Sequence, residues 1–117
     1  MILIEKVVRD FLGGKLECPV LLEDTNKAQK RVLIEKTSGS GEYTYESTLA
    51  IQSYGGSLYE ASTLNSEVIA LLLKDGDEPG LLSVNDIIDI ELNSNYNYTD
   101  TSTKEYRYQA VFDITHY

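Results

Sequence analysis

The sequence predicts a small α+β domain in which two helices pack against a mixed or antiparallel sheet of about five strands. Apolar residues recur at helical spacing in two stretches and alternate with polar residues in several others. Short segments rich in glycine, serine or aspartate separate these stretches. The 117 residues suffice for one hydrophobic core but not for two. We therefore expect a single domain over residues 1–117, with the element order α-β-β-β-α-β-β.

The chain begins with the first helix, which three predicted strands follow. The apolar positions of this helix are Ile4, Val7, Val8, Phe11 and Leu12, and Gly13-Gly14 forms its C-terminal stop. The run CPVLLED comes next, and its Pro19 suits the start of a strand or a sheet edge. The runs RVLIEKT and EYTYESTLAIQSYG then indicate two strands, with SGSG as the hairpin loop between them. Alternation in the second run places Tyr43, Tyr45, Ser47, Leu49 and Ile51 on one face.

The second helix is expected directly after Gly55-Gly56. Ser57 and Glu60 have the spacing of a capping box, in which a hydroxyl and a carboxylate satisfy the first backbone donors of a helix. The apolar stripe, which we interpret as a core face, consists of Leu58, Ala61, Leu64, Val68, Leu71 and Leu72. The acidic segment DGDEPGLLS ends the helix. It lacks the further oxygen ligands and the closing glutamate of a calcium loop, so calcium binding is disfavoured.

The closing runs VNDIIDIELNSNYNYTD and KEYRYQAVFDITHY form a predicted hairpin that carries five of the nine tyrosines. Strict alternation places four of them, Tyr96, Tyr98, Tyr106 and Tyr108, on the same face as the aliphatic residues of both strands. With a turn centred near Asp100–Ser102, Tyr96 pairs with Tyr106 and Leu92 pairs with Ala110. The hairpin is then expected to be stiffened by cross-strand aromatic pairs, with its tyrosines on the core face.

The charge pattern disfavours binding of nucleic acid. The net charge is −9, and residues 37–117 hold thirteen acidic but only three basic side chains. The tyrosine-rich hairpin has only Lys104 and Arg107 nearby, so it does not match a platform for stacked bases, and sugar binding there is similarly disfavoured. The basic cluster of Lys27, Lys30, Arg31 and Lys36 is interpreted as a solvated loop and strand edge and not as a phosphate site.

No motif in the sequence points to catalysis, a cofactor or a metal. Cys18 is the single cysteine, which excludes an internal disulfide, and it is expected to be partly buried and structural. His116 is the single histidine, and we expect it to be solvated at the chain end. Neither a phosphate-binding glycine loop nor a dinucleotide fingerprint is present. No apolar run approaches the roughly 18 residues of a membrane helix. The charged start MILIEKVVRDFLGG matches neither a signal peptide nor an anchor, so synthesis in the cytosol is expected.

Two longer segments carry a resemblance to a known family. The segments SYGGSLYEASTLNSEV and ELNSNYNYTDTSTKEYRYQAVFDITHY resemble the tail terminator, or tail-completion, proteins of long-tailed bacteriophages and prophages. The starting run MILIEKVVRDFL and the run RVLIEKTSGSGE are also similar to that family. The resemblance extends over nearly the whole chain and implies a sheet with flanking helices.

The resemblance implies structural work and no enzyme activity. Tail terminators form a ring, usually of six subunits, that caps the tail tube, ends its polymerisation and joins the tail to the head connector. The implied partners are further copies of the chain, the tail tube protein and connector proteins, and DNA passes through the channel without specific binding. The implied location is the bacterial host cytoplasm during assembly and then the head–tail junction of the virion.

Two exposed loops are expected to supply the protein contacts, and two other functions stay open. The alternatives are a joining protein on the head side and a monomeric module that binds a sugar or a peptide on its tyrosine face. The residues expected to contact other subunits or the tube are Ser38, Gly39, Ser40, Gly41, Glu42, Asn95, Asn97, Thr99, Asp100, Thr101, Ser102, Thr103 and Lys104.

Overall fold

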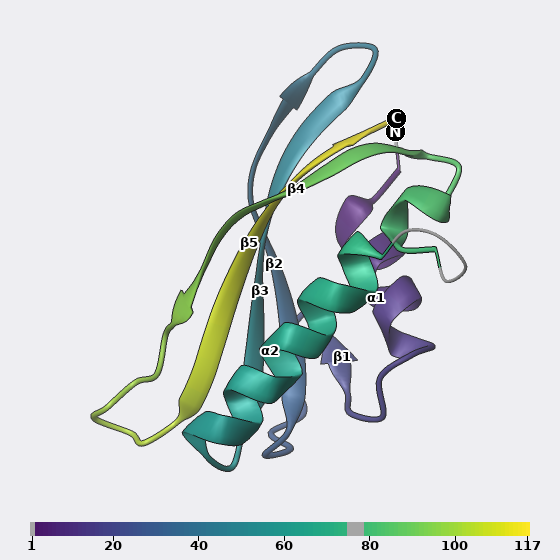
Figure 1. The fold of residues 1–117 in the computed structure, drawn as a ribbon. Helices are drawn as coiled ribbons and strands as arrows, with labels where there is room; N and C mark the ends of the chain where they lie inside the picture. The colour runs from purple at the N-terminus through teal and green to yellow at the C-terminus, as the bar shows by residue number, and fades with distance from the viewer. Residues whose placement is uncertain (1, 75–78) are drawn as a thin grey trace.

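A computed structural model describes residues 2–74 and 79–117 of the chain. Within these residues the predicted α+β domain is confirmed: a five-stranded sheet carries two α-helices on one face (Figure 1). The predicted element order is also found, with an additional 3-10 helix before the fourth strand. The elements are α1 (Ile4–Gly13), β1 (Val20–Leu21), β2 (Arg31–Gly41), β3 (Tyr45–Gly55), α2 (Leu58–Leu73), η1 (Leu81–Ser83), β4 (Ile87–Asn97) and β5 (Tyr106–His116).

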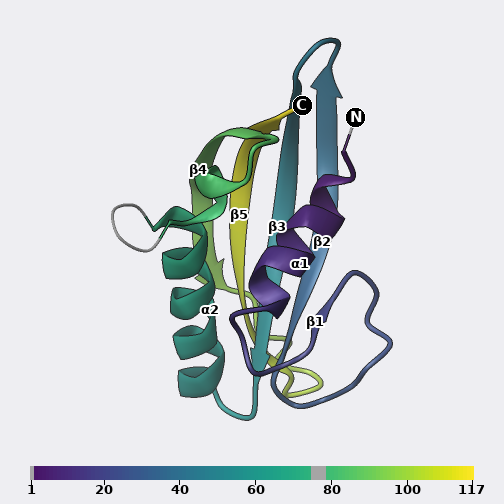
Figure 2. The ribbon, with the colours of Figure 1, turned by 90° about the vertical axis from the view of Figure 1, so that its right-hand side faces the viewer.

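The sheet is mixed, with the strand order β1-β2-β3-β5-β4. β1 pairs parallel with β2, and each of the other neighbouring pairs is antiparallel. Figure 2 looks onto the face that α1 and α2 cover. No described element packs on the opposite face, which we call the uncovered face; its central side chains are Gln52, Tyr54, Arg107, Gln109 and Val111.

The hydrophobic core lies between the two helices and the sheet. α1 and α2 each direct one apolar stripe inward, and β2, β3 and β5 contribute alternate residues, as the helical and strand periodicities require. Deeply buried members of the core are Ile4, Val8, Leu12, Val32, Ile34, Leu49, Ile51, Leu64, Val68, Leu72, Ala110, Phe112 and Ile114. The alternation predicted for β3 is therefore confirmed for Leu49 and Ile51.

The predicted cap of α2 is confirmed. The Ser57 side chain accepts a hydrogen bond from the Glu60 backbone N–H at 3.2 Å, and Glu60 Oε2 accepts one from the Gly56 N–H at 2.7 Å. The predicted apolar stripe is wrong at its first position, because Leu58 is 42% exposed at the start of the helix. Asn65 is buried instead and donates from Nδ2 to Asn95 Oδ1 at 2.6 Å, which ties α2 to β4.

The loop predicted at Ser38–Gly41 lies elsewhere. These residues continue β2, beyond a bulge between Lys36 and Ser38, and pair with β3 up to Gly41 opposite Tyr45. The turn is formed by residues 42–44. Gly41 has φ 131°, and a Cβ there would lie 2.0 Å from the Thr44 carbonyl oxygen. Glycine is therefore required where the turn begins, and not through a four-residue loop.

The predicted register of the closing hairpin is wrong by a few residues. Tyr96 lies opposite Gln109, not Tyr106, and Leu92 lies opposite Phe112, not Ala110. The register shifts between Leu92 and Ser94, because two residues of β4 there span one residue of β5. Such a bulge places an extra residue, Asn93, in the strand and moves every later side chain to the other face.

The bulge also corrects the predicted position of the tyrosines. Ile90 is buried in the core, but Tyr96 and Tyr98 lie beyond the bulge and share the uncovered face with Gln109 and Arg107. Each of the two tyrosine side chains is 42% exposed, and their rings meet edge to face with centroids 5.8 Å apart. The expectation that they continue the core face is therefore wrong.

Candidate interaction surface

The two segments predicted to make protein contacts lie at opposite ends of the sheet (Figure 1). Ser38–Glu42 form the exposed end of the β2–β3 hairpin. Residues 99–104 form the tip of the β4–β5 hairpin, where Thr101–Lys104 are exposed. Asn97 is exposed near this tip, whereas the Asn95 side chain contacts Asn65 of α2. The structure therefore does not bring the two predicted segments together within one subunit.

The tip of the β4–β5 hairpin is internally ordered. Asp100 and Glu105 exchange backbone hydrogen bonds of 3.2 and 3.3 Å. Asp100 Oδ1 accepts hydrogen bonds from the Ser102 hydroxyl at 2.7 Å and from the Ser102 N–H at 3.0 Å, and these bonds lower the pKa of Asp100. Lys104 has φ 55°, an unusual value for a residue other than glycine. The tip thus presents its side chains from a fixed backbone.

A chain of hydrogen bonds crosses the uncovered face from β5 to β3, returns to β5 and ends on β4. Arg107 Nη1 donates to the Tyr54 hydroxyl at 3.3 Å, and that hydroxyl donates to Gln52 Oε1 at 3.0 Å. Gln52 Nε2 donates to Gln109 Oε1 at 2.9 Å, and Gln109 Nε2 donates to the Tyr96 hydroxyl. Gln52, Tyr54 and Gln109 are buried although no described element covers them. A satisfied network of this kind makes the face rigid.

Arg31 extends this network to the loop before β2. Its guanidinium lies over the Tyr54 ring, 3.8 Å from the centroid, and its side chain is 5% exposed. Nε and Nη2 donate to the Asp24 carboxylate at 2.8 and 3.2 Å, and Nη2 lies 3.5 Å from Glu105 Oε1. Arg31 therefore connects the loop before β2, the end of β3 and the tip of the β4–β5 hairpin.

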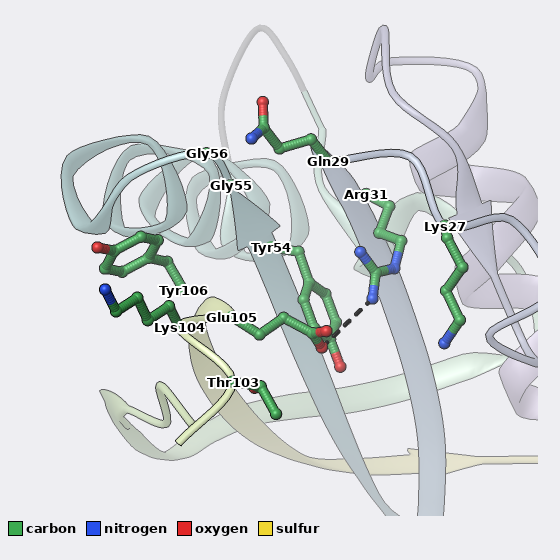
Figure 3. A pocket seen from close by; sticks show the side chains of 10 residues that line it. All are labelled: Lys27, Gln29, Arg31, Tyr54, Gly55, Gly56, Thr103, Lys104, Glu105 and Tyr106. Atoms are coloured by element: carbon green, nitrogen blue, oxygen red, sulfur yellow. Dashed lines mark ion pairs between the residues drawn. The ribbon is translucent and has the colours of Figure 1, made fainter. Parts of the chain in front are cut away.

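These elements line an open hollow of about 290 Å³ at one end of the sheet (Figure 3). Its lining residues come from three separate parts of the chain: Lys27, Gln29 and Arg31 before and at the start of β2, Tyr54, Gly55 and Gly56 at the end of β3, and Thr103, Lys104, Glu105 and Tyr106 at the hairpin tip. The volume lies at the lower limit of small-molecule pockets. A single side chain or a small anion fits such a space better than a large ligand does.

Basic side chains are concentrated around the hollow, and the carboxylates of Asp24 and Glu105 offset part of their charge. Three of the ten basic side chains, Lys27, Arg31 and Lys104, line it. Arg31 and then Lys27 donate hydrogen bonds that hold the pKa of Asp24 below its usual range. The interpretation of Arg31 as part of a solvated cluster is wrong, because Arg31 is buried, whereas Lys27, Lys30 and Lys36 are exposed as expected. Sequence reasoning missed the hollow, because its residues lie far apart along the chain.

Comparisons with known proteins do not assign the chain to a family. The chain matches none of the protein-family models against which it was scanned, and a search of curated proteins gives no match either. The surface described above and the resemblance of the two longer sequence segments are therefore the features that bear on function.

The histidine near the end of the chain is buried, which corrects its expected solvation. His116 is 1% exposed and lies in β5, where it pairs with Tyr45 and Ile87. Its Nε2 lies 2.7 Å from the Ser47 hydroxyl, its Nδ1 lies 3.0 Å from the Tyr117 carbonyl oxygen, and its ring stacks on Tyr45. Ser47 is also 1% exposed. The pair serves as packing at the sheet end, since a substrate has no path to it.

The single cysteine and the acidic segment after α2 were the other positions considered for chemistry. Cys18 is half-buried, and burial raises the pKa of its thiol. Asp75–Glu78, the acidic part of the segment compared with a calcium loop, lie outside the described residues. In the part of the chain that the structure describes, no group of three or more His, Cys, Asp or Glu side chains is placed to hold a metal ion. No described helix is long and apolar enough to cross a membrane.

The uncovered face is expected to contribute a pH-dependent part of the stability through Asp113. Hydrogen bonds from Asn93 at 2.9 Å and from Thr48 at 2.7 Å lower the pKa of Asp113. Because folding favours the ionised carboxylate, this stabilisation is complete above the ordinary aspartate pKa of about 4 and is lost as the pH falls through the lowered value.

Urea unfolding of wild type and Asp113→Asn at pH 7 and at pH 3 measures this contribution. The difference in free energy of unfolding should be larger at pH 7 and shrink at pH 3. Thr48→Val removes one of the two donors and should give a smaller change in the same direction. A difference that is equal at both pH values would contradict the assignment.

Proposed function

We propose that this chain is a subunit of a phage tail-terminator ring, which caps the tail tube, ends its polymerisation and joins the tail to the head connector. The observation that carries the proposal is a convergence in space. The two segments with the family resemblance are separated by more than twenty residues, yet both line the same hollow, through Gly55 and Gly56 from one and Thr103–Tyr106 from the other. Tyr54 and Arg107, one from each segment, pair across β3 and β5.

Surface chemistry supports a subunit whose partners are proteins. The uncovered face combines tyrosine, arginine and amide side chains, and tyrosine and arginine are the residue types enriched at protein interfaces. Both long hairpins end in exposed residues at opposite ends of the sheet (Figure 1). A net charge of −9 suits a channel through which DNA slides without binding. The function proposed is structural and not catalytic, and it is exercised in the host cytoplasm and then in the virion.

A monomeric binding module is the second candidate, and one observation favours it. Tyr96 and Tyr98 lie on the uncovered face, half-exposed, and the Arg107 guanidinium lies 4.6 Å from the Tyr98 ring centroid. Exposed aromatic rings next to polar side chains are suited to a sugar or a peptide. A joining protein on the head side has the same surface requirements as a terminator, so only its partner distinguishes it.

The proposal is tested with the purified chain and the tail tube protein encoded in the same genome. The chain is expected to limit the length of growing tubes and to appear as a ring on one tube end in negative-stain micrographs, while light scattering reports the size of the cap. Binding to the purified head connector with no effect on tubes would favour the joining protein. A strict monomer that leaves tube length unchanged and binds neither partner would overturn the ring function.

A further inference from the structure

The tip of the β2–β3 hairpin carries an aromatic side chain that is almost fully exposed to solvent. Tyr43 is 92% exposed, the highest value among the large hydrophobic side chains that the structure describes as exposed. It stands in the short turn of residues 42–44, next to exposed Glu42, and Gly41 fixes the start of this turn by its positive φ. An aromatic residue on a projecting turn is a typical anchor at protein interfaces.

The hollow has the size and chemistry to receive this tip. Its volume of about 290 Å³ suits one large side chain, and the partly exposed Tyr106 ring and Gly56 supply surface for an aromatic ring. Lys27 and Lys104 lie on opposite sides of this space, as Figure 3 shows. The exposed Lys104 complements the carboxylate of Glu42, which would enter beside the tyrosine, whereas Lys27 is already paired with Asp24 at 2.7 Å.

We infer that Glu42 and Tyr43 of one copy dock into the hollow of the next copy. The tip of the β2–β3 hairpin lies at the opposite end of the long sheet from the end of β3 and the β4–β5 tip, which line the hollow (Figure 1), and the molecule is 43 Å in its longest dimension. A hairpin therefore does not reach the hollow of its own chain, and in the proposed ring the occupant is the hairpin of a second copy. Contacts between two different surfaces join copies head to tail, and they close into a ring where the rotation between copies allows it. This inference rests on the proposed ring function and specifies its subunit contact.

Disulfide capture tests the contact directly. In a Cys18→Ser background, Thr44→Cys places a thiol at the tip and Thr103→Cys places one at the hollow. The two single variants, carrying tags of different size, are mixed under mild oxidation with and without tail tubes. In the control, Ser66→Cys replaces the hollow variant and is mixed with Thr44→Cys; Ser66 is exposed in the middle of α2. The Thr44→Cys and Thr103→Cys pair is expected to give at least about tenfold more linked heterodimer than this control pair. Heterodimer yields no higher than this control under both conditions would overturn the inference.

Replacement of the anchor provides a second, independent readout. Tyr43→Ala is expected to weaken association of the copies at least about tenfold, as loss of an interface anchor does, while Tyr43→Phe retains most of the association. Lys104→Glu should weaken the contact, and Glu42→Lys in the adjoining copy should restore it. Tube capping by the wild type without heterodimer capture would refute this contact and leave the ring function standing. Capture without tube capping would do the reverse.

Discussion

Replacing Arg31 by alanine is expected to lower the free energy of unfolding by about 3–5 kcal/mol, the cost of removing one partner from a buried ion pair. The side chain of Arg31 is only 5% exposed, and its loss leaves the Asp24 carboxylate, which is 23% exposed, without its main donor. The contact of the guanidinium with the Tyr54 ring and the bond to the Ala28 carbonyl oxygen at 2.9 Å are lost as well. Urea unfolding at pH 7 measures the change.

Lys27→Ala is the matched control for Arg31→Ala. Lys27 contacts the same carboxylate at 2.7 Å, but its side chain is 71% exposed, and exposed ion pairs contribute about 0–1 kcal/mol. Arg31→Lys keeps the charge but loses the planar fork that reaches Asp24 through two nitrogens, so an intermediate loss is expected. Equal effects of Arg31→Ala and Lys27→Ala would show that burial of Arg31 contributes nothing to the stability.

The fold could be predicted from the sequence because its elements carry local signals. The 3.6-residue repeat of α1 and the capping pair Ser57 and Glu60 are readable over a few residues, and the structure confirms both elements. The strands are bounded by glycine-, serine- and aspartate-containing segments, so their order along the chain is also readable. What local signals do not contain is the pairing of strands, which depends on contacts between residues far apart in the sequence.

The faces of the closing hairpin were not predictable, because one extra residue reverses them. Alternation is a reliable rule only while the ladder is regular, and the bulge at Asn93 interrupts it without a glycine or proline to signal it. The Asn93 side chain bonds to Asp113 on the neighbouring strand, a contact that appears only once the strands are paired. For this reason Tyr96 was expected in the core and lies on the uncovered face.

The candidate site was predictable only in part. Residues 99–104 were recognised as an exposed tip, but nothing local indicates that this tip meets Arg31 and the end of β3 to line an open hollow. Arg31 belongs to a run of basic residues that suggests solvent, and its burial follows from the placement of Tyr54 and Asp24 around it. A signal that could have helped is the pairing of Arg31 with Tyr54 on the neighbouring strand, but the register of β2 and β3 had to be known first.

The difference between the two faces of the sheet can be measured at two adjacent residues of β5. Phe112 is fully buried against the helices, and Phe112→Ala is expected to lower the free energy of unfolding by about 3–5 kcal/mol, through lost transfer energy and the cavity left behind. Val111 points to the uncovered face and is half-buried, so Val111→Ala is expected to cost about 1 kcal/mol or less. The two residues pair with neighbouring positions of β3, Leu49 and Ala50.

A domain of this size typically has a free energy of unfolding of about 5–15 kcal/mol, so Phe112→Ala removes a large part of it. Phe112→Leu, which keeps most of the volume, should fold in any case and cost less than Phe112→Ala. Similar losses at Phe112 and Val111 would contradict a sheet with one covered and one uncovered face.

The expected difference between the two faces determines which side chains can be used to study assembly. Because the apolar core depends on only one face, the exposed side chains of the uncovered face, such as Tyr96 and Tyr98, can be altered to probe contacts between copies while each copy stays folded, whereas the buried network around Arg31 and Tyr54 cannot.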